Sequence, residues 1–142
     1  MPLRPASRYL VSAIFAALIA FGGVARADDA ADIRAVIESQ TAALSAGDAK
    51  RAFGYATPNI QSRFGSSAVF MHMVEQGYSA LIRPTVFEVE DVETRGDRAA
   101  ARAFLVAGDG RVYRAVYPLA RQPNGEWRID GCFLTPAEDK AA

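Results

Sequence analysis

The amino-acid sequence predicts an α+β domain in which N-terminal helices pack in the concave face of a curved antiparallel sheet of about four strands. Apolar residues between positions 28 and 82 recur at helical spacing, whereas residues 85–136 show the period of two that is typical of strands. Helices and strands do not alternate along the chain. This order favours an α+β domain over a doubly wound parallel sheet.

Residues 1–27 have the pattern of a cleaved export signal. Arg4 and Arg8 precede an apolar stretch from about Leu10 to Phe21, and Ala25-Arg26-Ala27 offers a small-x-small cleavage site. The alternative is an uncleaved membrane anchor, but the stretch is shorter than the roughly 20 apolar residues of a span. We therefore expect Sec-type export, cleavage after Ala27, and a periplasmic or secreted protein without membrane attachment.

The rest of the chain is expected to form one domain over residues 28–136, followed by a disordered tail at 137–142. Without the three leader arginines, 13 basic residues stand against 16 acidic ones, a net charge of −3. Such a domain, which has no basic run, is not expected to bind nucleic acid. Cys132 is the only cysteine, so an internal disulfide is impossible. We expect it to act as a small buried hydrophobe, and the alternatives are an intermolecular disulfide or a reactive thiol.

The first helix is predicted to begin near Asp28, since Asp28, Asp29 and Asp32 suit the electropositive start of a helix. Gly47 can end it in the left-handed conformation. One face carries the helically spaced stripe Ile33, Val36, Ile37, Gln40 and Leu44. Asp48 then resembles the N-cap of a short helix that stops near Thr57, because Pro58 disfavours a helical residue before it. One or two further turns are expected in 59–65.

The stretch AVFMHMVEQGY, residues 68–78, raises the question of a metal site because His72 lies between two methionines. With Ser66 or Ser67 as cap, residues 68–76 form a helix, and adjacent side chains on a helix diverge. His72 then falls on the polar face, so no metal site is predicted. The expected apolar face comprises Val69, Phe70, Met73 and Val74. Gly77 is expected to end the helix in the left-handed conformation and to bring Tyr78 onto Met73.

Four strands are predicted over residues 85–94, 98–108, 111–121 and 126–136, with turns at Gly96, Asp109-Gly110 and Gly125. In the third strand, Tyr113, Ala115, Tyr117 and Leu119 share a face. In the fourth, Trp127, Ile129, Gly131 and Phe133 oppose Arg128, Asp130, Cys132 and Leu134. The alternation does not tell which face is concave. Asp130 beside Arg128 is expected to form an ordinary surface ion pair.

Four segments within roughly residues 33–134 are distinctive in combination: ATPNIQSRFG, FMHMVEQGY, RPTVFEVE and GEWRIDGCFL. Together they resemble an uncharacterised family of exported bacterial proteins, domain of unknown function 4864. The resemblance implies the nuclear transport factor 2-like fold, also called SnoaL-like, and an exported location. It implies no activity, and this fold carries isomerases, dehydratases, hydrolases and binding modules.

Familiar catalytic motifs, such as a glycine-rich phosphate loop or G-x-S-x-G, do not occur in the sequence. No cofactor is indicated. We therefore expect a non-catalytic module that binds a small, partly apolar ligand or forms a homodimer through the sheet. Two alternatives remain: a small isomerase, dehydratase or hydrolase using a perturbed pocket carboxylate or tyrosine, and an accessory subunit of an envelope complex. The predicted pocket residues are Tyr55, Phe64, Met73, Tyr78, Tyr117 and Trp127, and Arg63, Arg102 and Arg114 are further polar candidates.

Overall fold

A computed structural model describes residues 22–137, with side chains from residue 28 onward. Most of the predicted leader and of the predicted tail therefore lies outside the described residues. Four α-helices precede the sheet: α1 (Gly22–Ser45), α2 (Ala49–Gly54), α3 (Pro58–Phe64) and α4 (Ser67–Gly77), with a 3₁₀ turn, η1, at Ser79–Leu81. The strands are β1 (Val86–Arg95), β2 (Arg98–Val106), β3 (Val112–Arg121), β4 (Trp127–Ile129) and β5 (Phe133–Pro136). Within the described part of the chain, no helix is long and apolar enough to span a membrane.

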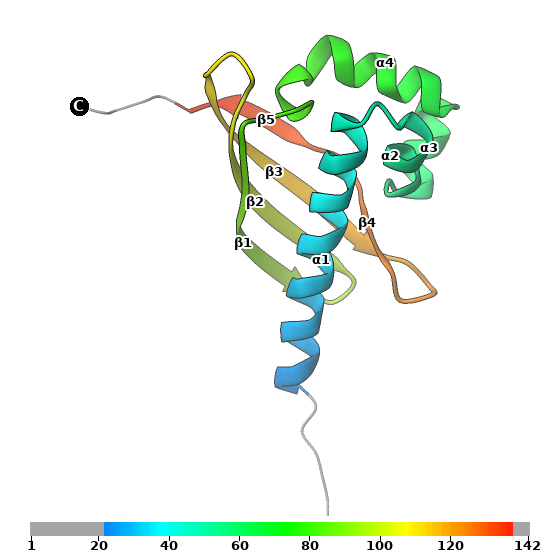
Figure 1. Cartoon of the computed structure of the whole chain (residues 1–142). Helices are drawn as coiled ribbons and strands as arrows, with labels where there is room; N and C mark the ends of the chain where they lie inside the picture. The colour runs from blue at the N-terminus through cyan, green and yellow to red at the C-terminus, as the bar shows by residue number, and fades with distance from the viewer. Residues whose placement is uncertain (1–21, 138–142) are drawn as a thin grey trace, which may run out of the picture.

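The five strands form one antiparallel sheet in which β1, β2 and β3 follow each other and both β4 and β5 pair with β3. Figure 1 shows α1 lying across one face of this curved sheet, while α2, α3 and α4 group near the end of α1. The predicted α+β architecture is thus confirmed, with five strands in place of about four.

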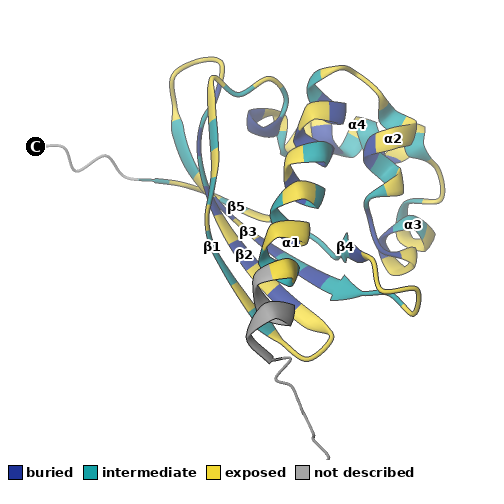
Figure 2. Ribbon diagram, turned by 60° about the horizontal axis from the view of Figure 1, so that its bottom comes forward, coloured by how far each residue is buried: buried dark blue, intermediate teal, exposed yellow. Residues whose placement is uncertain are grey.

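The core lies between α1 and the concave face of the sheet. Most of the predicted stripe is buried, and Val36 packs against the margin of the core. The buried members are Ile33, Ile37, Gln40 and Leu44. On β3, Ala115, Tyr117 and Leu119 are buried, so the face containing Tyr113 and Tyr117 is the concave one. Figure 2 shows buried residues alternating with more exposed ones along β2 and β3.

The two ends of α1 differ in how well the sequence predicts them. Gly47 has φ +72°, Asp48 N–H donates to the carbonyl of Ala43 and Gly47 N–H to that of Leu44. These bonds are the Schellman arrangement that a left-handed glycine allows, as expected. The start is wrong by six residues, because α1 begins at Gly22 and not near Asp28. No proline interrupts residues 22–27, so nothing local stops the helix there.

Two predictions for the end and face of α4 are wrong. Gly77 does not have a positive φ, and Tyr78 N–H donates to the Val74 carbonyl at 2.8 Å. The chain enters η1 directly, so no left-handed glycine is needed to end the helix. Val69 is also exposed, and Phe70 and Val74 form the buried face. His72 is exposed, as predicted, and Ser66 caps the helix by accepting a hydrogen bond from Val69 N–H.

The predicted fourth strand is broken at Gly131, which has φ +142°. Leu119 of β3 pairs with Ile129 of β4. Val116 lies three residues before Leu119, but its partner Phe133 lies four residues after Ile129. The segment from β4 to β5 therefore contains one extra residue. Because side chains alternate with a period of two, this extra residue reverses the faces beyond it. Trp127 and Ile129 point inward as a pair, but Phe133 is 65% exposed and does not share their face. Cys132 and Leu134 pack against the core instead.

Candidate functional site

An apolar pocket of about 260 Å³, partly open to solvent, lies between the β4–β5 segment and a group of short helices, α2, α3, α4 and η1, that we call the helical cap. Its walls come from α1, α3, α4, η1 and the break between β4 and β5. The lining residues of α1 and the helical cap are Gln40, Leu44, Ala56, Ile60, Arg63, Phe64, Phe70, Met73, Val74, Tyr78 and Leu81; those of the sheet side are Ile129, Asp130, Gly131, Cys132 and Phe133. A largely apolar wall with a few polar groups is typical of small-molecule sites.

Three of the predicted pocket residues, Phe64, Met73 and Tyr78, line this pocket, and so does Arg63. Tyr55 and Trp127 instead line a separate groove between α1, α2 and the β3–β4 turn. Ligand binding by any of these residues stays a prediction.

The remaining predicted positions lie elsewhere. Tyr117 is fully buried in the core and lines none of the described pockets, because its strand passes beneath α1. Arg102 and Arg114 lie on the outer face of the sheet, where they pair with Asp91 and Glu90 at 3.0 Å and 2.8 Å. They therefore cannot contribute to a pocket on the concave side.

The aromatic side chains of α2, α3 and α4 form the apolar end of the pocket region. The ring centroid of Phe70 lies 5.4 Å from that of Phe53 and 5.9 Å from that of Phe64, the latter in an edge-to-face arrangement. Such pairs stabilise the arrangement of the three short helices beyond simple burial. Phe70 was predicted as a core residue; its contact with the pocket follows from the position of α3, which the sequence does not reveal.

A short parallel bridge holds the sheet side of the pocket to the start of α3. Ile129 N–H donates to the Tyr55 carbonyl and Thr57 N–H to the Ile129 carbonyl, both at 2.9 Å. The hydroxyl of Thr57, the N-cap of α3, donates to the Asp130 carboxylate at 2.7 Å. These bonds fix the β4–β5 break against the helical cap.

Asp130 is therefore not the surface partner of Arg128 that the sequence suggested. Its carboxylate is 22% exposed and lies 3.6 Å from the guanidinium of Arg98, while Arg128 pairs with Glu126 at 3.5 Å. Asp130 keeps the register of β4, since its N–H donates to the Pro118 carbonyl at 2.7 Å, but its carboxylate contacts Arg98 and Thr57 instead of Arg128. Among the described residues, Asp130 is the one carboxylate that lines the pocket, and the sequence did not indicate it because its partners come from distant elements.

Two further groups beside the pocket are held in their neutral forms. Burial raises the pKa of Tyr117 well above its ordinary value, the nearby Cys132 raises it further, and a hydrogen bond with Thr41 acts in the opposite direction. Burial also raises the pKa of Cys132 to about 12, although its hydrogen bond with Tyr117 lowers it. Near neutral pH, neither group is an effective base or nucleophile, since the thiolate is the reactive form of cysteine.

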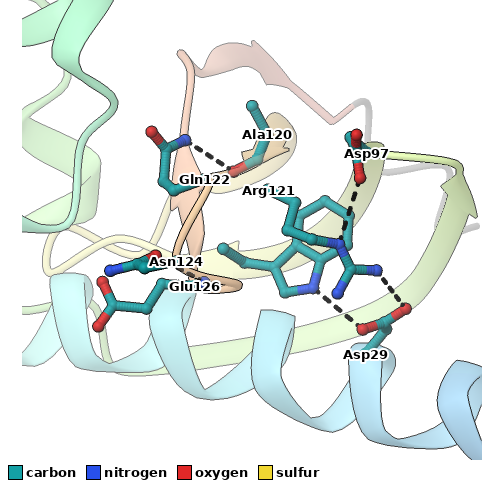
Figure 3. A network of polar contacts seen from close by, with 8 residues as sticks. Asp29, Asp97, Ala120, Arg121, Gln122, Asn124 and Glu126 are labelled. Carbon is teal, nitrogen blue, oxygen red and sulfur yellow. Dashed lines mark hydrogen bonds and ion pairs between the residues drawn. The ribbon is translucent and has the colours of Figure 1, made fainter.

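At the opposite end of the sheet, a polar cluster that we call the Asp29 clamp joins α1 to β3 and β4. Asp29 accepts hydrogen bonds from Arg121 at 2.9 Å and from the indole N–H of Trp127 at 3.2 Å. Figure 3 shows Arg121 between Asp29 and Asp97, to which it also lies at 3.5 Å. The guanidinium stacks 4.6 Å above the Trp127 ring. The clamp holds α1 against β3 and β4, and its side chains do not line the apolar pocket.

Within residues 28–137, no group of three or more histidine, cysteine, aspartate or glutamate side chains is placed to hold a metal ion.

The fold is NTF2-like, as a solved structure shows. A crystal structure of an NTF-2-like protein of unknown function from Burkholderia xenovorans LB400 matches with a TM-score of 0.50 at 16% identity, covering 77% of this chain and 87% of the other. The model of the domain of unknown function family DUF4864 matches residues 26–142, and the chain belongs to this family. Comparison with curated proteins gives no match.

Proposed function

We propose that the protein is a non-catalytic module that binds a small, predominantly apolar ligand in the pocket between α3, α4 and the β4–β5 break. The observation that carries this proposal is the chemistry of the wall. Phe64, Phe70 and Met73 give an apolar surface, while the thiol of Cys132 is held neutral by burial. A cavity of about 260 Å³ has room for roughly nine water-sized volumes of about 30 Å³ each, and so for a ligand of about ten non-hydrogen atoms.

The carboxylate of Asp130 is the observation that bears on the enzymatic alternative. A general base needs a free, correctly placed oxygen. Asp130 instead accepts from Thr57 and lies beside Arg98, so it is engaged in holding the pocket wall together. This arrangement favours binding over acid–base catalysis.

Native mass spectrometry of the protein produced from its full gene with the leader tests the proposal. We expect the folded protein to carry or take up a small apolar compound, such as an aromatic probe of about ten non-hydrogen atoms. Met73→Trp, which places a larger side chain at the pocket wall, should abolish uptake. Met71→Trp is the matched control, because Met71 lies on the same helix but lines a different groove. Equal uptake by both variants would contradict the proposed site.

The same spectra test the location that we propose for the protein, export with cleavage after Ala27. The subunit mass should correspond to residues 28–142. That cleavage would remove the first six residues of α1 and retain the Asp29 clamp. A subunit that keeps its first 27 residues would contradict cleavage.

Self-association through the outer face of the sheet is a second candidate function. Val116, 38% exposed, pairs in register with the exposed Phe133, and Phe104 lies beneath the guanidinium of Arg114 on the same face. Exposed apolar side chains that cluster on a sheet are typical of an interface. The face also carries acidic residues on β1 and arginines on β2 and β3, so two copies can place opposite charges against each other.

Sedimentation velocity tests this second candidate. If two copies pack through the sheet, Val116→Glu should convert a dimer to a monomer, because it buries a charge at the centre of the contact. Val69→Glu serves as the control, since Val69 is 52% exposed on α4, away from the sheet. A wild-type protein that is monomeric at high micromolar concentration would contradict self-association.

A further inference from the structure

The polar groups of the pocket fall into two sets, those already engaged and those free to contact a ligand. The amide of Gln40 donates to the Ala52 carbonyl at 3.1 Å. Asp130 accepts from Thr57 at 2.7 Å and lies 3.6 Å from the guanidinium of Arg98. Gln40 and Asp130 are therefore bound to the protein itself, and burial keeps the Cys132 thiol neutral.

Arg63 and Tyr78 form the second set. Arg63 is exposed in the last turn of α3 and makes no ion pair with another residue of the described part of the chain. The side-chain hydroxyl of Tyr78 likewise makes no hydrogen bond within residues 28–137. Both residues line the pocket. Each offers a donor, and the guanidinium presents a fork of N–H groups that matches a carboxylate.

We propose that the pocket selects a small apolar monoanion, such as an aromatic or short aliphatic carboxylic acid. This inference rests on the proposed ligand-binding function and adds the charge of the ligand. The apolar body would fill the space beside Phe64 and Met73, and the carboxylate would meet Arg63 and Tyr78 at the rim. Arg63 is the one cationic side chain among the described residues that line the pocket, so it matches a single negative charge.

Three probes of nearly equal shape test the charge preference: 3-phenylpropanoate, 3-phenylpropanol and 3-phenylpropylamine, which is protonated at neutral pH. Their dissociation constants are measured by calorimetry or ligand-observed NMR at low ionic strength. We expect the acid to bind roughly five- to tenfold more tightly than the alcohol, a range consistent with a partly exposed charge-assisted hydrogen bond. The amine should bind most weakly.

Arg63→Gln should reduce the affinity for the acid to that for the alcohol and leave the alcohol unaffected, while Arg63→Lys should retain part of the preference. Arg111→Gln is the matched control, since Arg111 is an exposed arginine in the β2–β3 turn and does not line the pocket. Far-UV circular dichroism confirms that each variant is folded.

The outcomes separate the two proposals. Equal affinities for the three probes, or a preference for the amine, would overturn the charge preference while supporting the ligand-binding function. A preference for the acid that survives Arg63→Gln would overturn the role of Arg63. If none of the probes binds at millimolar concentration, both the charge preference and the ligand-binding function are overturned.

Discussion

Replacing Asp29 with alanine is expected to lower the free energy of unfolding by about 2 to 3 kcal/mol, within the range for losing hydrogen bonds to a charged group in a partly buried site. The Asp29 carboxylate is only 15% exposed, and Arg121 is 32% exposed. The substitution leaves the indole N–H of the buried Trp127 without its acceptor and Arg121 without its closest carboxylate. Chemical denaturation followed by circular dichroism measures the loss.

Two controls separate the clamp from a general effect on α1. Asp29→Asn keeps an acceptor for Trp127 but removes the charge, so about half of the loss is expected. Asp32→Ala changes an exposed aspartate on the same helix and should alter stability by less than about 0.5 kcal/mol. Equal effects of Asp29→Ala and Asp32→Ala would show that the clamp contributes nothing. The emission of Trp127, the only tryptophan, should change in the native state of Asp29→Ala.

The second large effect is a loss of stability at alkaline pH. Burial raises the pKa of Cys132 from its ordinary value of 9.0 to about 12 in the folded protein. The stabilising contribution is therefore complete below about pH 9. Between pH 9 and about 12 the unfolded chain loses the thiol proton while the folded chain keeps it. Stability then falls by about 1.4 kcal/mol per pH unit, or about 2 kcal/mol at pH 10.5. The raised pKa of Tyr117 acts in the same direction above pH 10.

Cys132→Ala isolates this contribution, because it lacks the thiol and shares every other titrating group with the wild type. We expect the stability difference between the two proteins to change by about 2 kcal/mol from pH 8 to pH 10.5, with the wild type losing more. Denaturation curves are measured under reducing conditions at both pH values. Parallel losses in the two proteins would contradict the buried, neutral thiol.

Features that depend on neighbouring residues were predicted well from the sequence. The buried stripe of α1, the left-handed Gly47, and the caps Asp48 and Ser66 were all confirmed. In each case the information lies in the spacing of apolar residues or in a side-chain oxygen three positions before the backbone N–H that donates to it. His72 was placed correctly on the surface for the same reason, since a helical register fixes the directions of adjacent side chains.

Other predictions from neighbouring residues were wrong or incomplete, because contacts with distant parts of the chain determine the structure there. The Gly77-Tyr78 pair resembles a helix stop of the kind found at Gly47, but the chain continues into η1 and the glycine keeps an ordinary φ. Val69 fits the apolar face by angle, yet it is 52% exposed, and no element of the described part of the chain covers it. Asp29 was predicted to favour the start of a helix, whereas its carboxylate binds residues about 90 positions away.

The candidate site shows the same division. Phe64, Met73 and Tyr78 could be proposed because small-molecule pockets are lined mostly by apolar and aromatic side chains. Cys132 and Phe133 received their positions from one extra residue in the pairing of β4–β5 with β3, and Asp130 from its contacts with Thr57 and Arg98. A periodic pattern cannot reveal such an insertion, because every residue beyond it is still compatible with a strand but faces the other side.

The sequence by itself therefore determined the α+β class, the order of the elements, the face of α1 that is buried and the family resemblance that the comparison confirms. These properties follow from periodicity and short-range hydrogen bonding. The tertiary structure alone decided which face of the sheet is concave, which charged side chains form ion pairs and which polar groups line the pocket. Those depend on strand register and on contacts between distant residues, which local interactions leave undetermined.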